Sequence, residues 1–294
     1  MNEFELIRRY FARQPVTRAD VALGIGDDAA LLQPPAGQQL VVTTDLLISG
    51  VHFLPDADPV ALGHKALAVN LSDLAAMGAQ PAWFLLNLAL PAADESWLAK
   101  FSAGLFELAQ RYHVQLVGGD TSRAPQIVIA IEAHGFVPAG QALERAGAKT
   151  GDHIFVTGPL GDAGLALRHR QGKLRLLDAE LASCAVRMDR PAPCIEEGLA
   201  LRGIASSAID ISDGLVADLG HILGMSHVGA RLELARLPLS PAYRTHLAEV
   251  GWDVALANGD DYELCFTVPP GKLAALEQTK TRFPGITEIG LIES

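Results

Sequence analysis

The chain has 294 residues, of which 49% are hydrophobic and 19% are charged, and its 34 Asp and Glu outnumber its 23 Lys and Arg to give a formal net charge of −11. This composition is too apolar for an intrinsically disordered protein, and a chain of this length buries enough surface to fold without disulfides or a structural metal. The acidic balance argues against a nucleic-acid backbone or an anionic membrane surface as a partner, so we expect neither.

Cysteine usage and hydropathy indicate a cytoplasmic protein. The three cysteines form no CxxC pair, which disfavours a disulfide framework and a cysteine-based zinc site. Four charged residues fall within the first nine positions, where a signal peptide would need an apolar core. The most apolar stretch, Pro81–Ala93, is interrupted by Asn87 and Pro91 and is shorter than the roughly 20 residues of a membrane span.

Strands and helices are expected to alternate along residues 1–138. A β-branched run predicts a strand over Leu40–Thr44, and Asp58 followed by Pro59 predicts the start of a helix that ends at Gly78. Buried or alternating apolar runs predict further strands, and one helical repeat lies between them: strands over 83–90, 114–117 and 127–137, and a helix over 95–112.

A second α/β half follows a segment rich in Gly and Ala, residues 138–151, where we place the domain boundary. Its expected strands are 153–157, 208–211 and 262–268. Its expected helices are 161–170, a stretch of roughly 25 residues that reaches Arg202, one that contains Leu215, Leu219 and Leu223, and 273–278. The sequence therefore predicts an α/β (α+β) protein of two domains, residues 1–138 and 150–294.

The placement of the aspartates is the informative feature of this sequence. They stand beside glycine or at expected strand ends in GIGDD, TTD, GGDT, IDISDG and NGDDYEL, whereas Asp73 lies on a helix, three residues after Asn70 and on the same face. Each one alone could be a turn or cap residue. Because strand ends of α/β folds meet at one rim, we expect several of these carboxylates to share a cleft.

Clustered carboxylates favour bound cations. Two unit charges about 4 Å apart repel by roughly 4 kcal/mol at an effective dielectric constant of 20. Ligand sets made only of oxygen select hard cations, chiefly Mg²⁺, and no HExxH or HxH pattern indicates zinc. We hypothesise that the aspartates hold several divalent ions that bridge to a nucleoside triphosphate.

The common nucleotide-site motifs are absent. The chain has no GxxxxGK[ST] loop, no HRD and DFG set and no GxSxG nucleophile elbow. Gly24, Gly26 and Ala29 fit a dinucleotide-type GxGxxA, but Asp27 and Asp28 would repel a pyrophosphate there. Metal-assisted phosphoryl transfer or hydrolysis remains, because such chemistry relies on alignment and cations more than on a protein base.

Several long motifs resemble one known family. The segments GIGDDAALL, TTDLLISGVHFLP, KALAVNLSDLAAMGAQPAW, GGDTSR, IDISDGLVADLGHI and GDDYELCFTVP are similar to thiamine-monophosphate kinases, in the superfamily that includes aminoimidazole ribonucleotide synthetase. The resemblance implies transfer of the ATP γ-phosphate to thiamine monophosphate, with Mg²⁺ and without a phosphoenzyme, to give thiamine diphosphate. It also implies a homodimer whose N-terminal halves build a shared β-barrel, each with a C-terminal α/β layer domain.

The resemblance further implies roles for single residues, with no catalytic group beyond the metal ligands and Arg145. The ATP contacts would be Gly119, Asp120, Arg145 and Ser212, and the thiamine monophosphate contacts His52 and Asp260. The metal-facing residues would be Asp28, Thr43, Thr44, Asp45, Asp73, Asp120, Asp210 and Asp213. Whether K⁺ also takes part stays open.

Two departures from the family pattern and two alternative functions accompany this reading. Asp260 stands where a glutamate is expected, and the chain ends at Ser294, before a segment that in the family brings an aromatic side chain against the thiamine ring. The alternatives are a superfamily enzyme with another phosphoryl acceptor and a nucleotide- and metal-binding module without catalysis. Selenophosphate synthesis is disfavoured because no cysteine precedes Cys184.

Overall fold

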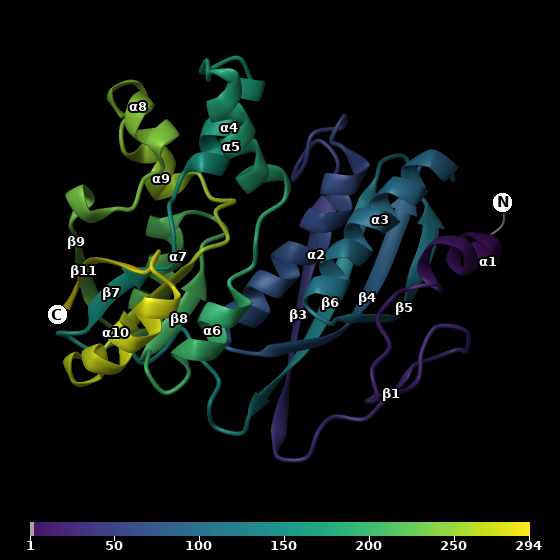
Figure 1. Ribbon diagram of the computed structural model, residues 1–294, viewed down its shortest axis with the longest axis horizontal. Helices are drawn as coiled ribbons and strands as arrows, with labels where there is room; N and C mark the ends of the chain where they lie inside the picture. The colour runs from purple at the N-terminus through teal and green to yellow at the C-terminus, as the bar shows by residue number, and fades with distance from the viewer. Residues whose placement is uncertain (1–2) are drawn as a thin grey trace. The chain divides into compact units, whose positions relative to one another are not determined.

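The computed structural model describes residues 3–294 and divides into two compact units (Figure 1). Unit 1 comprises Met1–Leu74 and Gln80–Ala139, and unit 2 comprises Ala75–Ala79 and Gly140–Ser294. Among the described residues, no helix combines the length and the apolar character needed to cross a bilayer.

Unit 1 is built on a four-stranded sheet of order β3-β6-β4-β5, in which only β4 and β5 run parallel. A short two-stranded sheet, β1-β2, precedes it in the chain. The elements are α1 (Glu3–Leu6), the π-helical turn η1 (Ile7–Phe11), β1 (Val21–Leu23), β2 (Leu31–Leu32), β3 (Gln38–Ile48), α2 (Pro59–Ala76), β4 (Gln80–Leu90), α3 (Glu95–Arg111), β5 (Gln115–Arg123) and β6 (Val128–Pro138).

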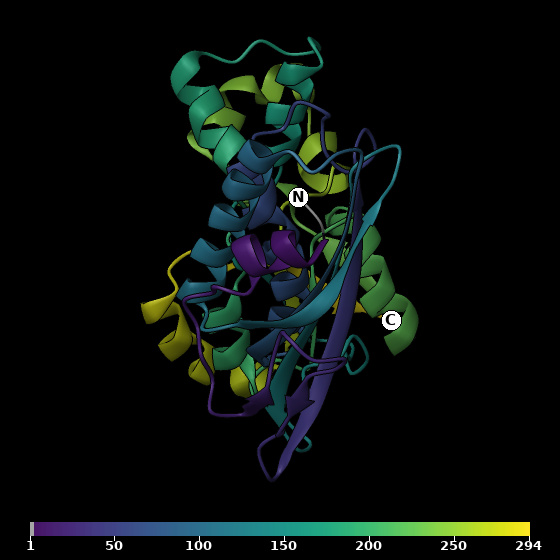
Figure 2. The same cartoon turned by 90° about the vertical axis from the view of Figure 1, so that its right-hand side faces the viewer.

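Helices α2 and α3 cover one face of this sheet, as Figure 2 shows with the strands nearly edge-on. The predicted cap of α2 is confirmed, because Asp58 Oδ2 accepts the Ala61 N–H at 3.0 Å and Pro59 opens the helix. The helices approach closely where each carries a glycine. A Cβ on Gly63 would lie 2.0 Å from the Phe101 carbonyl oxygen, so the sequence can place these axes together only with glycine there.

The opposite face of the sheet is partly covered and partly open. At one end Trp83 and Phe136 pack with Val117 against the β1-β2 segment. Along β3, side chains alternate between the two faces, and Leu40, Val42 and Leu46 are exposed on the uncovered one. Unit 1 therefore combines a closed core on its helical side with an apolar sheet surface on the other.

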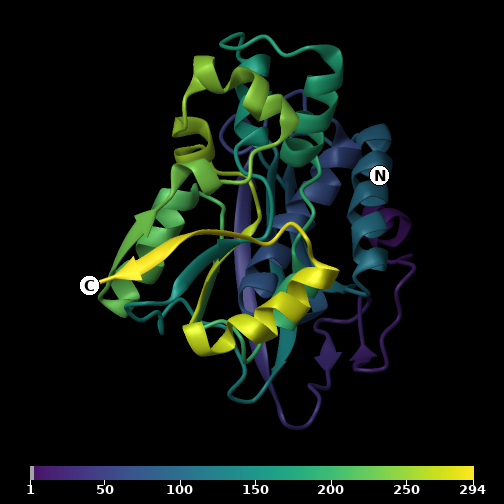
Figure 3. The same cartoon turned by 60° about the vertical axis from the view of Figure 1, so that its left-hand side comes forward.

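Unit 2 is built on a five-stranded, fully antiparallel sheet of order β8-β10-β7-β11-β9. Its strands are β7 (His153–Val156), β8 (Ser207–Asp210), β9 (Gly229–Leu232), β10 (Leu264–Val268) and β11 (Thr287–Glu293). Its helices are α4 (Asp162–Arg170), α5 (Asp178–Asp189), α6 (Ile195–Leu201), α7 (Leu215–Ser226), α8 (Pro241–Val250), α9 (Asp253–Ala257) and α10 (Leu273–Arg282), with the 3₁₀ turns η2 (Leu234–Arg236) and η3 (Pro270–Lys272). Figure 3 brings this unit forward, with α10 and β11 in yellow.

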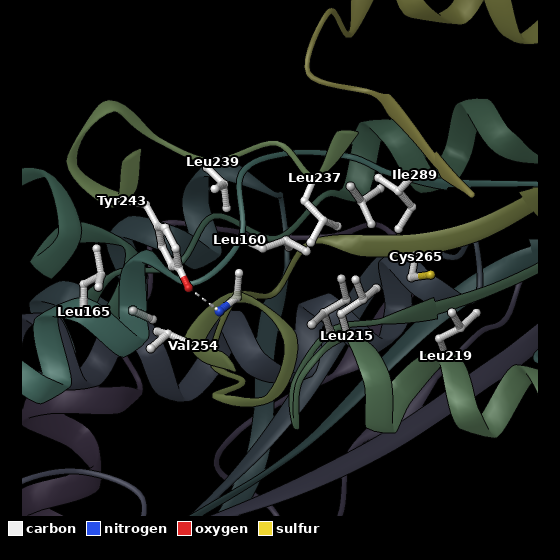
Figure 4. Close-up of a cluster of buried hydrophobic side chains, with 14 of the residues drawn as sticks. Leu160, Leu165, Leu215, Leu219, Leu237, Leu239, Tyr243, Val254, Cys265 and Ile289 are labelled. Atoms are coloured by element: carbon white, nitrogen blue, oxygen red, sulfur yellow. Dashed lines mark hydrogen bonds between the residues drawn. The ribbon is translucent and has the colours of Figure 1, made fainter. Parts of the chain in front are cut away.

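The core of unit 2 joins α4, α7, α8 and α9 to the sheet (Figure 4). Tyr243 is fully buried in it, and its hydroxyl donates to the Gly251 carbonyl at 3.0 Å and accepts the Ala255 N–H at 2.9 Å. The buried phenol therefore has its polar tip satisfied, and it ties α8 to α9.

Most predicted elements are present, and three expectations are wrong. The strand expected to end at Val117 continues through the glycine pair to Arg123, and Asp45 lies inside β3 rather than at its end. The helical stretch of roughly 25 residues is two helices, α5 and α6, separated by residues 190–194, where Pro191 and Pro193 remove backbone donors. The expected barrel is one that two subunits share and stays a prediction; within residues 3–294, neither main sheet closes on itself.

Candidate functional site

An acidic pair forms where β3 faces α2 in unit 1. Thr43 Oγ1 donates to Asp73 Oδ2 at 2.5 Å, and the Asp45 N–H donates to Asn70 Oδ1 at 3.0 Å. The shared helix face predicted for Asn70 and Asp73 is therefore confirmed, and both side chains meet the same strand. Thr44 does not join them, because its hydroxyl donates to the Ile131 carbonyl at 3.1 Å.

The electrostatics of this pair favour a cation. Burial, with a smaller contribution from the negative charge of Asp73, raises the pKa of Asp45 from 3.8 to about 6. A carboxyl that binds its proton this tightly is short of positive charge nearby. Asn70 is fully buried and donates through Nδ2 to the Ala66 carbonyl at 3.1 Å, which fixes its amide and leaves Oδ1 for the Asp45 N–H.

A cavity of about 720 Å³ lies elsewhere in unit 1. One wall is the loop 25–30, which carries Asp27 and Asp28, and another is the β5 segment 116–121, which carries Gly119 and Asp120. Apolar side chains, among them Ile7 and Phe11 of η1, close the remainder. The cavity thus combines an apolar wall with carboxylates on two others, and its volume suits a ligand of several hundred daltons.

Gly119 is required by the geometry of β5. Its φ is +139°, and a Cβ there would lie 1.8 Å from the Leu86 carbonyl oxygen on β4. Only glycine lets the two strands approach at this point, which places Asp120 at the cavity edge. The Asp120 carboxylate accepts a hydrogen bond from Ser122 Oγ at 3.0 Å.

The two acidic groups of unit 1 are separate. The sheet register runs from Asp45 through Ile131 and Leu86 to Gly119, which is three strand spacings, or about 14 Å. Within residues 3–294, no three His, Cys, Asp or Glu side chains are close enough together to hold a metal ion. Within unit 1 the acids therefore form two groups, in keeping with a mostly antiparallel sheet whose strand ends do not all meet at one rim. The cleft expected to be shared by several of the aspartates of the chain stays a prediction.

In unit 2, the segment Ser212–Gly214 is organised by an aspartate that the sequence reading did not single out. Asp218 Oδ2 accepts the backbone N–H groups of Ser212, Asp213 and Gly214 at 3.0, 3.0 and 3.1 Å. Burial raises the pKa of Asp218, against the effect of these three donors. Its sequence signal is an acid in the first turn of a helix that follows SDG, where it can accept amides of the preceding loop.

The loop 258–262 lies against this segment. The Asp260 N–H donates to the Ser212 carbonyl at 2.9 Å, and Tyr262 Oη donates to Asp260 Oδ1 at 2.9 Å. Asp260 and Tyr262 both adopt left-handed backbone conformations, with φ of 63° and 50°. Such conformations in non-glycine residues cost free energy and cluster at functional sites.

Three further predicted residues have simpler surroundings. Arg145 is exposed and follows Glu144, whose carbonyl accepts the Ala208 N–H of β8 at 2.9 Å. Asp210 is buried at the end of the same strand. In unit 1, His52 Nδ1 accepts the Ile48 N–H at 3.1 Å.

One family model and several known proteins match this chain. The model for AIR synthase related protein, N-terminal domain, matches residues 26–137. Thiamine-monophosphate kinase of Escherichia coli (strain K12) is 54% identical over 277 residues, which cover 94% of this chain and 85% of that protein. Its counterpart in Bacillus subtilis (strain 168) is 37% identical, with 99% and 91% covered.

Solved structures give the same result. The crystal structure of thiamine-monophosphate kinase from Stenotrophomonas maltophilia K279a superposes with a TM-score of 0.91 at 48% identity and covers 100% of this chain and 95% of that one. The chain belongs to the thiamine-monophosphate kinase family. The structure described as AaThiL complexed with AMPPCP and TMP is 34% identical, with a TM-score of 0.79 and coverage of 92% and 85%.

Membership in the thiamine-monophosphate kinase family confirms the resemblance and makes the chain a phosphotransferase. The structure shows that the GxGxxA pattern does not open a dinucleotide-binding helix. The short strand β1 precedes the pattern, but strands β2 and β3, and not a helix, follow it. Beyond Asp218, no site role was predicted from sequence for Asn70, Ile7 or Phe11. Asn70 gave a signal through its spacing from Asp73, whereas the apolar cavity wall of Ile7 and Phe11 is set by tertiary packing and gave none.

Proposed function

We propose that the chain transfers the γ-phosphate of ATP directly to thiamine monophosphate, with Mg²⁺, and that it does so as a homodimer. The observation that carries the nucleotide assignment is the cavity of about 720 Å³ between the loop 25–30 and the β5 segment 116–121. Apolar side chains on one wall suit a base or ribose face, and carboxylates on the others suit metal-bound phosphates. The relative AaThiL, complexed with AMPPCP, an analogue of ATP, and TMP, supports the same assignment.

The residues present fit Mg²⁺. Every proposed ligand offers oxygen, which hard cations prefer, and the proton that Asp45 holds up to pH of about 6 marks a site where a cation would relieve repulsion from Asp73. The proposed metal-facing residues are Asp28, Thr43, Thr44, Asp45, Asp73, Asp120, Asp210 and Asp213. Bound Mg²⁺ would supply charge neutralisation on the phosphates.

The protein residues would bind and align the two substrates. Gly119 would let the β5 backbone approach the phosphates. From the family resemblance we also assign Arg145, as a positive charge, and Ser212, as a hydroxyl, to ATP binding. Asp260 and His52 would contact thiamine monophosphate. The Tyr262 hydroxyl occupies Asp260 Oδ1, which restricts how the carboxylate can meet the substrate.

The homodimer is supported by the open face of the unit 1 sheet. Leu40, Val42 and Leu46 are 45%, 53% and 49% exposed and lie on the same side of strand β3, at the sheet edge. An exposed apolar row of this kind marks an interaction surface. A second copy that presents the same face would bury it, in agreement with the shared barrel that the family resemblance implies.

Turnover tests the proposed function. Purified protein is incubated with ATP, Mg²⁺ and thiamine monophosphate, and products are separated by chromatography. Thiamine diphosphate and ADP in equal amounts, absent without Mg²⁺, are expected. AMPPCP binding without product would favour the non-catalytic module, and product only from another acceptor would favour a different superfamily activity.

A further inference from the structure

A network of four side chains fixes the segment before β1 to the unit 1 sheet; we call Arg18, Asp20, Trp83 and Gln115 the clasp. Arg18 donates from Nε to Asp20 Oδ1 at 2.9 Å and from Nη2 to Asp20 Oδ2 at 2.7 Å. Trp83 Nε1 on β4 donates to Asp20 Oδ1 at 3.1 Å, and the Arg18 backbone N–H donates to Gln115 Oε1 on β5 at 2.7 Å. Asp20 and Arg18 thus connect the segment to two neighbouring strands.

Each partner in the clasp is itself held in place. Trp83 is 1% exposed and meets the Phe136 ring edge-on, with centroids 5.0 Å apart. Arg18 Nη1 donates to the His113 carbonyl at 2.9 Å. The hydrogen bond from Arg18, against a smaller opposing effect of burial, holds the pKa of Asp20 below its usual value, so the carboxylate is ionised at neutral pH. Bidentate, charge-assisted bonds of this kind define orientation as well as energy.

The clasp anchors both ends of the segment that carries one cavity wall. Asp20 directly precedes β1, and its carbonyl accepts the Gln33 N–H just after β2 at 2.8 Å. The exposed loop 25–30 lies between these anchored strands. Gln115 lies three residues before Gly118, in the strand that forms the other acidic wall.

We propose that Asp20 is a positioning residue for nucleotide binding, because it fixes the loop that carries Asp28 relative to the strand that carries Asp120. Asp20 itself touches no substrate; it acts through Asp28 and the cavity shape. This inference rests on the proposed function for the identity of the ligand. Pre-organised walls favour a bound metal–nucleotide complex, since a displacement of about 1 Å in a positioning group can reduce activity by roughly a hundredfold.

Asp20→Asn tests the proposal, since it keeps the side-chain shape and weakens the ion pair with Arg18. We expect both the KM for ATP and the dissociation constant for AMPPCP with Mg²⁺ to rise on the order of tenfold. The kcat at saturating ATP and the KM for thiamine monophosphate should change less than about twofold. Trp83→Phe, which removes the indole donor together with part of the buried ring, should shift ATP affinity in the same direction by a smaller factor.

The matched control is Asp189→Asn in unit 2. The Asp189 carboxylate also takes two bonds from one arginine, from Arg170 Nη1 at 2.7 Å and Nη2 at 2.5 Å, but Asp189 does not line the cavity of unit 1. It should leave all kinetic constants unchanged. Hydrogen exchange adds a structural readout: the amides of residues 24–30 should exchange faster in Asp20→Asn, while those of β4 and β6 stay protected.

The outcomes separate the two proposals. Unchanged ATP and AMPPCP affinity in Asp20→Asn, or equal losses in kcat and both KM values, would overturn the positioning role. If the wild-type protein makes no thiamine diphosphate, the proposed function fails, and AMPPCP affinity still decides the role of Asp20. If Asp20→Asn does not fold, Trp83→Phe gives the same decision through its KM for ATP.

Discussion

Asp45 shows how a proposed metal ligand can reduce the stability of the metal-free protein. Folding raises its pKa from 3.8 to about 6, chiefly by burial and further by Asp73. The folded state therefore binds this proton more tightly than the unfolded state. As pH rises through the window from 3.8 to about 6, the folded state loses stability, by up to about 3 kcal/mol once Asp45 is ionised.

Asp45→Asn should therefore stabilise the metal-free protein in a pH-dependent way. The gain in unfolding free energy over wild type is expected to be near zero at pH 4 and about 2 kcal/mol at pH 7.5, because the amide never ionises. Urea unfolding with EDTA at both pH values measures it. The same gain at both pH values would contradict the assignment, and Mg²⁺ should stabilise wild type more than the variant.

Asp261 contrasts with Asp45, because its buried carboxyl has a structural role. It is 3% exposed, its Oδ1 accepts the Gly161 N–H at 2.8 Å, and its Oδ2 has no hydrogen-bond partner. Burial raises its pKa well above the usual value. The Asp261 carboxyl at the start of α4 thus serves as an acceptor for a backbone amide, and the side-chain amide of asparagine can take over that role.

We predict that Asp261→Asn changes the unfolding free energy by less than about 1 kcal/mol, whereas Asp261→Ala lowers it by about 2 to 3 kcal/mol. The alanine leaves the Gly161 N–H buried without an acceptor and opens a small cavity. Urea unfolding of the two variants at pH 7.5 measures the difference. A larger loss in the asparagine variant than in the alanine variant would show that the ionised form is required.

At the scale of an element, the glycine pair Gly118-Gly119 inside β5 can be tested for its contribution to stability. Gly119→Ala should lower the unfolding free energy by more than about 3 kcal/mol and weaken AMPPCP binding, because its Cβ would meet the Leu86 carbonyl at 1.8 Å with φ at +139°. Gly118→Ala is the matched control. A Cβ at position 118 would meet only Leu85 Cδ2, at 3.0 Å, and this side chain can move. We therefore expect Gly118→Ala to lower the unfolding free energy by less than about 1 kcal/mol, and urea unfolding of both variants measures the difference.

The same strand shows where sequence patterns stop being informative. Long periodic elements such as α2 and α3 were predictable, because apolar spacing and the Asp58-Pro59 cap are local signals. The extension of β5 through Gly118 and Gly119 was not, because glycine usually ends a strand and only the close approach of β4 explains it. Strand β9 and helix α9 were also missed, since each is short and gains its stability from tertiary packing.

At the scale of the whole molecule, the family motifs and the physical argument about strand ends contributed differently to the prediction of the site. The motifs identified the family, whereas the rim argument for clustered acids assumed parallel strands, and in the two main sheets only β4 and β5 run parallel. In unit 1, Asp45 and Asp73 come together instead through α2, which brings Asn70 and Asp73 to β3, while the strand register places Asp120 with a separate group on β5. Register depends on which strands pair and on the turns between them, and the local patterns of this sequence did not indicate the pairing of β3 with β6.

The open sheet face gives the last prediction, at the level of the assembly. Val42 is 53% exposed in the middle of the apolar row on β3, so Val42→Asp would place a charge inside any interface between two copies of this face. Sedimentation equilibrium should give a dimer for wild type and a monomer for Val42→Asp. Leu177→Asp in unit 2, where the leucine is 70% exposed, removes as much exposed apolar surface elsewhere and should remain dimeric. A dimer in both variants would exclude the β3 face as the interface, because a buried unpaired carboxylate costs more than a standard interface tolerates.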